Sequence, residues 1–516
     1  MKTKIKNTIL SFTVITALSL VSCENLLDIE QHGTSSFETF YQTDEEADEA
    51  ITACYTGFAA VYFNYYLSKN NLCDDFWCGG GGRGDNDSFE KMNEWTFNQE
   101  LDYLKNMFTG YYQMIYSANV VLGHVPDETP IQKRARAEAR VFRAFAYIDL
   151  ISMWGTPPLV DHELTPSEYR LSNGEPDALW KLVEDDLNEA IADGALSEKS
   201  NVNDRSSYRI TKQFAQALLG KALVFQKKWA QAAQELDKVI TSGKYDLYAD
   251  YENMLQYTTK NNCESLFEIN HLDDPANAMS ANWSLLTAMA GWRSDKMDIT
   301  SGLVSKDTWG FCSNFQKDLY DAFVANGDNY RLKATMKNYD EVKAQGDKVA
   351  EGKELYGHEG YFMWKNRVDP NEMISGGWLA TKNNHRVMRY AEVFLLAAEA
   401  HLEASNNGQA LEYINRIRSR AKLNALATID INQIRLEKRL ELCGESVRFQ
   451  DMLRWGIAEE KMRDQGKRTP SFQSSGTTQW NTYNSDMAGF KSKHNLLPFP
   501  QIELTLNPNI KQNTGW

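Results

Sequence analysis

The sequence predicts a mainly α-helical protein, a tetratricopeptide-like helical scaffold that carries long irregular insertions. Two helix–turn–helix hairpins, at about residues 210–242 and 389–420, place apolar residues at steps of three and four. Three stretches, at about residues 72–98, 245–388 and 465–495, lack this period and are rich in Gly, Asn, Asp and aromatic residues. Irregular segments of that length on a rigid scaffold commonly carry binding residues.

The N-terminus has the pattern of an export signal. Three lysines precede an apolar run from Ile9 to Val21, which is too short to span a bilayer. The run ends in Leu20-Val21-Ser22-Cys23, which resembles the lipobox of bacterial lipoproteins. That resemblance implies a signal peptide over residues 1–22, lipid attachment to Cys23 and a single domain over residues 23–516. A plain secretory signal with a chance cysteine is the alternative.

Composition excludes several classes of protein. With 42% hydrophobic and 24% charged residues, the chain is neither disordered, collagen-like nor a polytopic membrane protein. Its net charge of −15 becomes −18 without residues 1–22, which argues against nucleic-acid binding and makes an anionic polysaccharide a less favoured ligand. Seven cysteines are too few for a disulfide-built fold, and none has zinc spacing, so we expect no metal and no cofactor. Spacing leaves open whether Cys73 and Cys78 pair.

The helices can be justified in chain order. Residues 134–153 carry apolar side chains on one helical face. In the first hairpin, Trp229 takes a core position, and the second helix places Ala233 and Ile240 seven residues apart. The second hairpin repeats that spacing with Ala410 and Ile417. After it, a segment rich in Arg and Glu, residues 435–456, places opposite charges three and four residues apart, which favours structural ion pairs over a catalytic pair.

Behind the lipobox at Cys23, six motifs in order resemble the SusD/RagB family of outer-membrane nutrient-binding lipoproteins, and the resemblance covers almost the whole chain. They are Arg140–Tyr147 through Trp154-Gly155-Thr156-Pro157-Pro158-Leu159-Val160, Arg209-Ile210-Thr211-Lys212, Arg389–Leu395, Arg435–Leu442, Glu445–Gly456, and the end from Leu497-Pro498-Phe499-Pro500 to Gly515-Trp516.

This resemblance implies that the insertions form the ligand face. It implies a non-catalytic, lipid-anchored protein at the cell surface, held in the outer membrane, that captures oligosaccharide or polysaccharide. It also implies a partner, a TonB-dependent (SusC-like) transporter that receives the glycan. A peptide ligand, as for some relatives, and an envelope scaffold without a small ligand are the alternatives.

The glycine-rich loop at Gly79-Gly80-Gly81-Gly82 is the first candidate ligand site. No Gly-Lys-Ser/Thr follows it, so it is not a phosphate loop. A planar apolar ring and fork-like polar groups suit the two faces of a sugar, its C–H patches and its vicinal hydroxyls. The candidates around the loop are Trp77, Arg83, Asp85 and Asn86. A surface loop with a packed Trp is the alternative.

A second group of candidates lies in non-periodic sequence, where an arc of rings would follow a glycan chain. It comprises Trp283, Trp292, Arg293 and Trp309. Alternatively, each Trp fills a gap under the loop. Trp364, Trp378 and Trp480 are weaker candidates, and we expect Trp95 to pack in the core. Carboxylates alone cannot exclude a glycosidase, but no His-Glu-x-x-His or Gly-x-Ser-x-Gly motif occurs.

Overall fold

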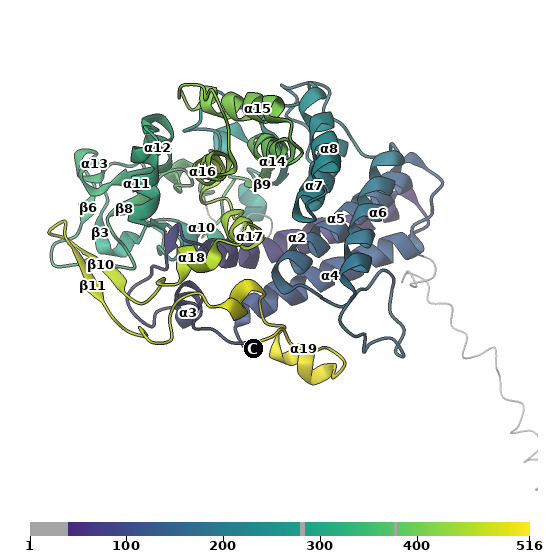
Figure 1. Cartoon of the computed structure of the whole chain (residues 1–516), viewed down its shortest axis with the longest axis horizontal. Coiled ribbons are helices and arrows are strands. Elements are labelled where there is room, and N and C mark those ends of the chain that lie inside the picture. The colour runs from purple at the N-terminus through teal and green to yellow at the C-terminus, as the bar shows by residue number, and fades with distance from the viewer. Residues whose placement is uncertain (1–39, 279–283, 376–378) are drawn as a thin grey trace, which may run out of the picture.

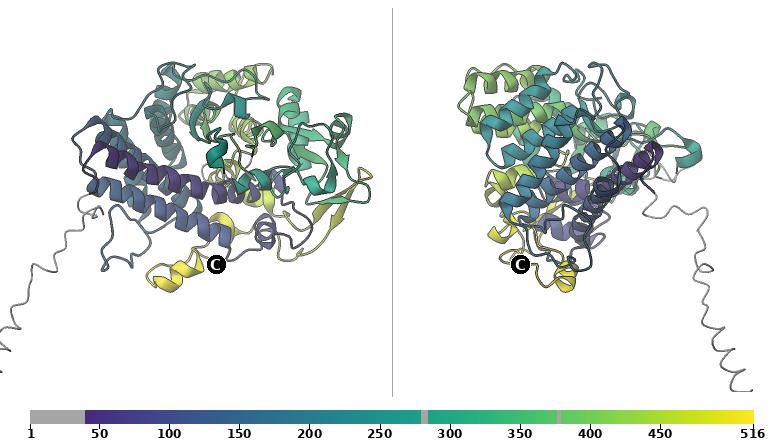
Figure 2. Two further views of the ribbon diagram at one scale, coloured as in Figure 1. Left: turned by 180° about the vertical axis from the view of Figure 1, so that it is seen from behind. Right: turned by 90° about the vertical axis from the view of Figure 1, so that its right-hand side faces the viewer.

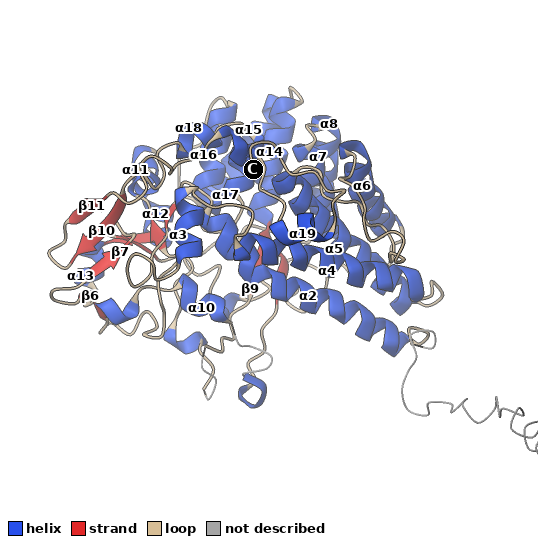
Figure 3. Cartoon of the chain, turned by 90° about the horizontal axis from the view of Figure 1, so that it is seen from below, coloured by secondary structure: helices blue, strands red, loops and turns tan. Residues whose placement is uncertain are grey.

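The computed structural model describes residues 40–278, 284–375 and 379–516. The predicted signal peptide, Cys23, Trp283 and Trp378 lie outside these residues. The mainly α-helical fold is confirmed: long helices form most of the molecule, and a smaller part with short strands lies at one end (Figures 1 and 3). Within the described ranges, no helix is long and apolar enough to cross a membrane.

A row of helices forms the scaffold, and each packs against the next along the chain (Figure 1). Sequence signals mark where they begin. Thr43 and Thr129 cap the first turns of their helices with reciprocal side-chain and backbone hydrogen bonds, and Pro130 takes the first helical position. The row comprises α2 (Asp44–Asn71), α4 (Asp102–His124), α5 (Pro130–Trp154), α6 (Pro176–Ala192), α7 (Lys212–Phe225), α8 (Trp229–Thr241), α14 (Tyr390–Glu403), α15 (Asn407–Arg420) and α16 (Ile431–Leu442).

Helices α7 with α8 and α14 with α15 occupy the positions of the two predicted hairpins, and α8 packs on α14. Small residues stand where these helices approach closely. A Cβ atom added to Gly220 in α7 would lie 2.5 Å from the Leu236 side chain of α8. Ala232, Ala233 and Ala410 are likewise buried. Close helix crossings therefore explain why the pattern alternates small and large apolar residues.

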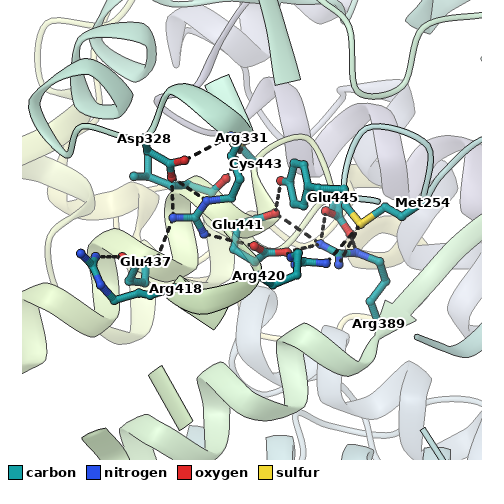
Figure 4. Close-up of polar contacts among 12 residues, drawn as sticks. Met254, Asp328, Arg331, Arg389, Arg418, Arg420, Glu437, Glu441, Cys443 and Glu445 are labelled. Atoms are coloured by element: carbon teal, nitrogen blue, oxygen red, sulfur yellow. Dashed lines mark hydrogen bonds and ion pairs between the residues drawn. The ribbon is translucent and has the colours of Figure 1, made fainter. Parts of the chain in front are cut away.

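The Arg- and Glu-rich segment forms two helices instead of one, because the chain turns at Gly444 and Ser446, both with positive φ, between α16 and α17 (Arg448–Arg454). Most of its charged side chains form buried ion pairs, and Figure 4 shows those of Glu437, Glu441 and Glu445. Glu441 contacts Arg331 at 3.1 Å and Arg389 at 3.2 Å, and it also pairs with Arg420. These contacts join α16 to α12 (Asn329–Thr335) and to the start and end of the second hairpin.

The three insertions assemble into one lobe, although they are far apart in the sequence (Figure 1). Strand β1 (Phe76–Trp77) of the first insertion joins β4 (Asn314–Phe315), β8 (Tyr361–Met363) and β5 (Met336–Asn338) of the second in one sheet. Strands β10 (Thr469–Gln473) and β11 (Thr478–Asn481) of the third pair with β7 (Glu354–Tyr356). A separate apolar core that includes Trp292, Phe362 and Phe472 fills the lobe.

The segment expected to be irregular, residues 245–388, contains short helices and strands. Among its described residues, no strand exceeds five residues and no helix exceeds nine, so no period could be read from them. The other α-helices and strands of the described ranges are α3 (Asp87–Glu94), β2 (Ser265–Ile269), α10 (Leu285–Ala290), β3 (Met297–Asp298), α11 (Lys317–Ala325), α13 (Tyr339–Ala344), β6 (Lys348–Val349), β9 (His385–Arg389), α18 (Ala458–Met462) and α19 (Gln501–Leu506).

The C-terminal motif folds back on the end of α5. The Trp154 indole donates to the Pro498 carbonyl at 2.9 Å, and the Asn513 amide donates to the Trp154 carbonyl at 2.9 Å. Viewed from behind, α2 lies at the surface beside α4, with one side uncovered by other helices (Figure 2). This side of α2 faces the hollows described next.

Candidate functional site

The glycine-rich loop is held close against the second insertion. A Cβ atom on Gly79 would lie 1.9 Å from the Gly310 carbonyl oxygen, and Gly80 has a φ of +120°. Glycine is therefore required here both by close backbone approach and by conformation. Just before the loop, Asp74 pairs with Arg448 at 2.7 Å and Asp75 with Arg439 at 2.8 Å. These buried pairs anchor the loop to the scaffold.

Three of the predicted ligand residues meet beside this loop. Arg293 Nη1 lies 3.4 Å from Asp85 Oδ2 and donates to the Trp309 carbonyl at 3.1 Å. Asp295 forms a second ion pair with Arg293 at 2.6 Å. The Trp309 backbone amide donates to Ala288 of α10 at 2.7 Å. Arg293 therefore connects the glycine-rich loop to α10, although Arg293 and Asp85 are 208 positions apart in the sequence.

Asn86 lines a hollow of about 650 Å³ between α2, α3 and the start of α4. It caps α3 by accepting from the Phe89 amide at 3.2 Å, and its Nδ2 donates to the Tyr103 hydroxyl at 3.3 Å. Tyr103 stacks on Phe89 with 4.2 Å between ring centroids. The other residues that line this hollow are Phe63, Asn64, Ser88, Asp102, Lys105 and Asn106.

A second hollow, of about 850 Å³, lies along the same side of α2 and shares Phe63 with the first. Its lining is mainly apolar and aromatic. Strands β2 and β9 and the start of α10 form the opposite wall, with Tyr208 exposed at the edge. We call the two hollows together the α2 groove. Its aromatic side chains are Tyr55, Phe58, Tyr62, Phe63, Tyr103, Tyr208, Phe267, His271 and His385.

The two histidines of the groove are neutral at pH 7. Burial lowers the pKa of His271 to about 4, and burial together with His271 and Arg386 lowers the pKa of His385 well below its ordinary value. The centroids of the two imidazole rings lie 4.9 Å apart, and His385 stacks on Tyr62 with 5.2 Å between ring centroids. They therefore act as planar, uncharged parts of the wall.

A small cavity of about 80 Å³ adjoins the groove through Tyr62, Leu286 and His385. Glu372 lines it and accepts from Thr381 at 3.3 Å and from Asn383 at 3.2 Å. Burial raises the pKa of Glu372 to about 7. Glu445, the other carboxylate that lines this cavity, is held in ion pairs with Arg389 and Lys365, so the two carboxyl groups do not make a free hydrolytic pair. Among the described residues, no group of three or more His, Cys, Asp or Glu side chains could hold a metal ion.

Trp77 and Arg83 point away from the groove, toward the hairpin of β10 and β11. Trp77 is 7% exposed, and its indole donates to Glu359 at 2.8 Å. Arg83 pairs with Glu90 at 3.1 Å and with Glu94, and it lies 4.6 Å over the Tyr483 ring. The structure therefore divides the residues predicted around the loop between two surfaces.

Trp292 has a structural position: it is 3% exposed, and its indole donates to the Met363 carbonyl at 2.8 Å. Trp364 and Trp95 are also buried, the latter as expected, whereas Trp309 and Trp229 are partly buried and Trp480 is 39% exposed. The six cysteines among the described residues are free thiols.

The aromatic side of α2 was not among the predicted site residues. Its signal in the sequence is Tyr62-Phe63-Asn64-Tyr65-Tyr66, a dense aromatic run shortly before the first insertion. Tyr103 carried no such signal, because its contact with Asn86 depends on the α3–α4 connection.

The fold and the groove define the class: a helical-repeat scaffold that presents an aromatic and amide-lined surface, as binding proteins do. Two family models agree with this. The model of the SusD family matches residues 264–516, and a second, described as "Starch-binding associating with outer membrane", matches residues 28–224. The chain belongs to the SusD family, as the six motifs indicated.

Known relatives match this chain over most of its length. A SusD-like protein of Bacteroides ovatus is 24% identical, with 96% of each chain covered. A solved laminarin-binding SusD-like protein is 27% identical and has a TM-score of 0.76, covering 92% of this chain and 100% of that one. Surface glycan-binding protein A from Bacteroides thetaiotaomicron, solved with laminarihexaose, is 24% identical with a TM-score of 0.72, covering 92% and 99%.

Proposed function

We propose that this protein is a non-catalytic glycan-binding protein and that the α2 groove is its ligand site. One observation carries the proposal: the Tyr103 and Phe63 rings stand beside the amide groups of Asn64, Asn86 and Asn106 in one hollow. Rings accept the C–H face of a sugar, and amides exchange paired hydrogen bonds with its hydroxyls. The groove combines both kinds of group along one helix.

The contact between Asp85, Arg293 and Trp309 forms one rim of this site in our proposal. It ties the glycine-rich loop, which ends at Asn86, to α10, whose Leu285 and Leu286 line the larger hollow. Both walls are then fixed relative to each other before a ligand arrives. Such preorganisation reduces the entropic cost of binding. Trp283, which precedes the groove residue Ser284, remains a predicted ligand residue.

The laminarin-binding relative, similar over its whole length, makes laminarin the first glycan to test. Lipid attachment at Cys23, exposure on the outer membrane and delivery of the glycan to a TonB-dependent transporter complete the proposal. The lipobox supports the lipid anchor, the description of the second family model supports the outer membrane, and the transporter is what membership of the family implies.

Geometry favours a glycan over the two alternatives. A peptide added to a sheet edge needs unpaired backbone groups, whereas the groove presents side chains, many of them aromatic. An envelope scaffold without a ligand would not need the amides and rings of the smaller hollow. No motif or family model points to an enzyme, and release of sugar from laminarin by the pure protein would contradict the non-catalytic proposal.

Affinity electrophoresis and calorimetry with laminarin, and with a panel of plant, host and microbial glycans, test the proposal. We expect Tyr103→Ala to weaken glycan binding by about tenfold, since one stacked ring contributes about 1.4 kcal/mol. Tyr169→Ala removes a ring that is 63% exposed and lines neither hollow, so it is the matched control. Equal glycan affinity for Tyr103→Ala and the wild type would refute the assignment of the groove.

A further inference from the structure

The hairpin of β10 and β11 presents exposed aromatic rings outside the groove. Trp480 on β11 is 39% exposed, and Tyr483, just beyond it, is 42% exposed. The Cζ atom of Arg468 lies over the Trp480 ring, 5.1 Å from its centroid, and that of Arg83 lies over the Tyr483 ring, 4.6 Å from its centroid. We call this surface, formed by Arg83, Arg468, Trp480 and Tyr483, the hairpin platform.

The platform is held rigidly. Trp480 pairs with Pro470 of β10, and its ring packs edge-on against the buried Trp77 at 5.8 Å between centroids. The third strand of this sheet, β7, fixes β10 from the other side, and Tyr356 of β7 accepts from Arg83 at 3.2 Å. An exposed ring fixed in this way loses little conformational entropy when a ligand stacks on it.

The surroundings of the rings suit a carbohydrate better than a protein. Arg468, the exposed side chain next to the Trp480 ring, is polar. A stable protein interface buries about 800 Å² on each partner around a central apolar cluster. Here each ring instead has a guanidinium group stacked on it, so rings and planar hydrogen-bond donors alternate. A sugar chain presents C–H faces and hydroxyls in the same alternation.

The platform is separate from the α2 groove. Arg83 faces the hairpin, whereas Asn86, three residues later, faces Tyr103 in the groove. Helix α3, which begins after Asn86, lies between the hairpin and α2 (Figures 1 and 3). One loop therefore contributes to two surfaces.

We propose that the hairpin platform is a second carbohydrate-binding site, which stacks a sugar on Trp480 and Tyr483 and hydrogen-bonds it through Arg468. The inference rests on the proposed glycan-binding function, because both sites would hold the same polymer. Two sites on one rigid chain raise the apparent affinity for a long glycan more than for a short one.

Fluorine NMR of the full chain labelled with 5-fluorotryptophan gives a readout at the platform itself. Trp480→Phe identifies the Trp480 resonance, and the fully buried Trp154 supplies a control resonance. We expect laminarihexaose to shift the Trp480 resonance in a saturable way, in the wild type and equally in Tyr103→Ala. We also expect Trp480→Ala to weaken retention in laminarin gels about three- to tenfold, as for loss of a stacked ring.

The outcomes separate the two proposals. If gels show laminarin binding but the Trp480 resonance does not move, the platform is not a glycan site and the groove proposal stands. If Tyr103→Ala abolishes the shift, the platform is not independent of the groove. If wild-type protein binds no glycan of the panel and none of them shifts a resonance, both proposals fall. If Trp480→Ala leaves glycan binding intact but loosens a co-purifying transporter, the platform contacts protein instead.

Discussion

Glu441 joins three arginines from separate parts of the chain, so replacing it by Gln is a sharp test of the buried charge network (Figure 4). Its carboxylate contacts Arg331 of α12, Arg389 at the start of the second hairpin and Arg420 at the end of α15. All four side chains are buried. Glu441→Gln keeps the shape of the side chain but removes the charge that balances the guanidinium groups.

The expected loss of stability follows from the pKa of this group. The arginines lower the pKa of Glu441 from 4.5 to about 2, against the opposing effect of burial. At 1.36 kcal/mol per unit, this corresponds to about 3 kcal/mol of unfolding free energy at pH 7. Removing one partner of a buried ion pair costs about 3–5 kcal/mol of stability, which agrees with the value obtained from the pKa. Because the folded pKa is lowered, this stabilisation is complete above pH 4.5 and is lost as the pH falls through about 2.

Urea unfolding, followed by tryptophan fluorescence and circular dichroism, measures the change in unfolding free energy. Urea is uncharged, so it does not screen the ion pairs. We expect Glu441→Gln to lose about 3 kcal/mol at pH 7 relative to the wild type, and less than half of that at pH 3. Asp185→Asn removes a half-exposed partner of Lys181 and serves as the control, with a change below about 1 kcal/mol. A loss below 1 kcal/mol for Glu441→Gln at pH 7, or a loss independent of pH, would refute the reasoning.

Three further predictions concern the site and its surroundings. Asn86→Ala should weaken glycan binding several-fold by calorimetry, because it removes both the cap of α3 and the donor to Tyr103. Arg293→Ala should weaken glycan binding a few-fold while thermal melting stays almost unchanged, because its pair with the exposed Asp85 contributes little stability; a large fall in the melting temperature would contradict this. Glu372→Gln should leave stability at pH 4 unchanged and raise it at pH 8 by up to about 3 kcal/mol in chemical unfolding. The reason is that burial raises the pKa of this carboxyl from 4.5 to about 7, so the folded state loses stability as the pH rises from 4.5 to about 7, and the loss is complete at pH 8; equal stability of variant and wild type at pH 8 would contradict it.

Helical period predicted the scaffold where helices are long and buried on one side. The hairpin helices each have 13 or 14 residues, so an apolar stripe can be read from them. Helix α2 shows why the method fails elsewhere. It has 28 residues, but Tyr62, Tyr65 and Tyr66 are all buried, so its C-terminal half lacks a polar face and its period is hidden. The wall of the α2 groove that this helix forms was therefore not predicted from the sequence.

Only part of the candidate site could be predicted. The type and approximate position of a residue can be read from the sequence, but the direction of its side chain cannot. Asp85, Arg293 and Trp309 were named from composition alone, and the fold brings them together across two insertions. Trp292, chosen by the same criterion, fills the core of the lobe. Trp77 and Asn86 lie nine positions apart, yet the positive-φ glycines between them turn the chain so that they serve different surfaces. A glycine-rich loop therefore indicates where a site is built, whereas its contacts determine how many surfaces it serves.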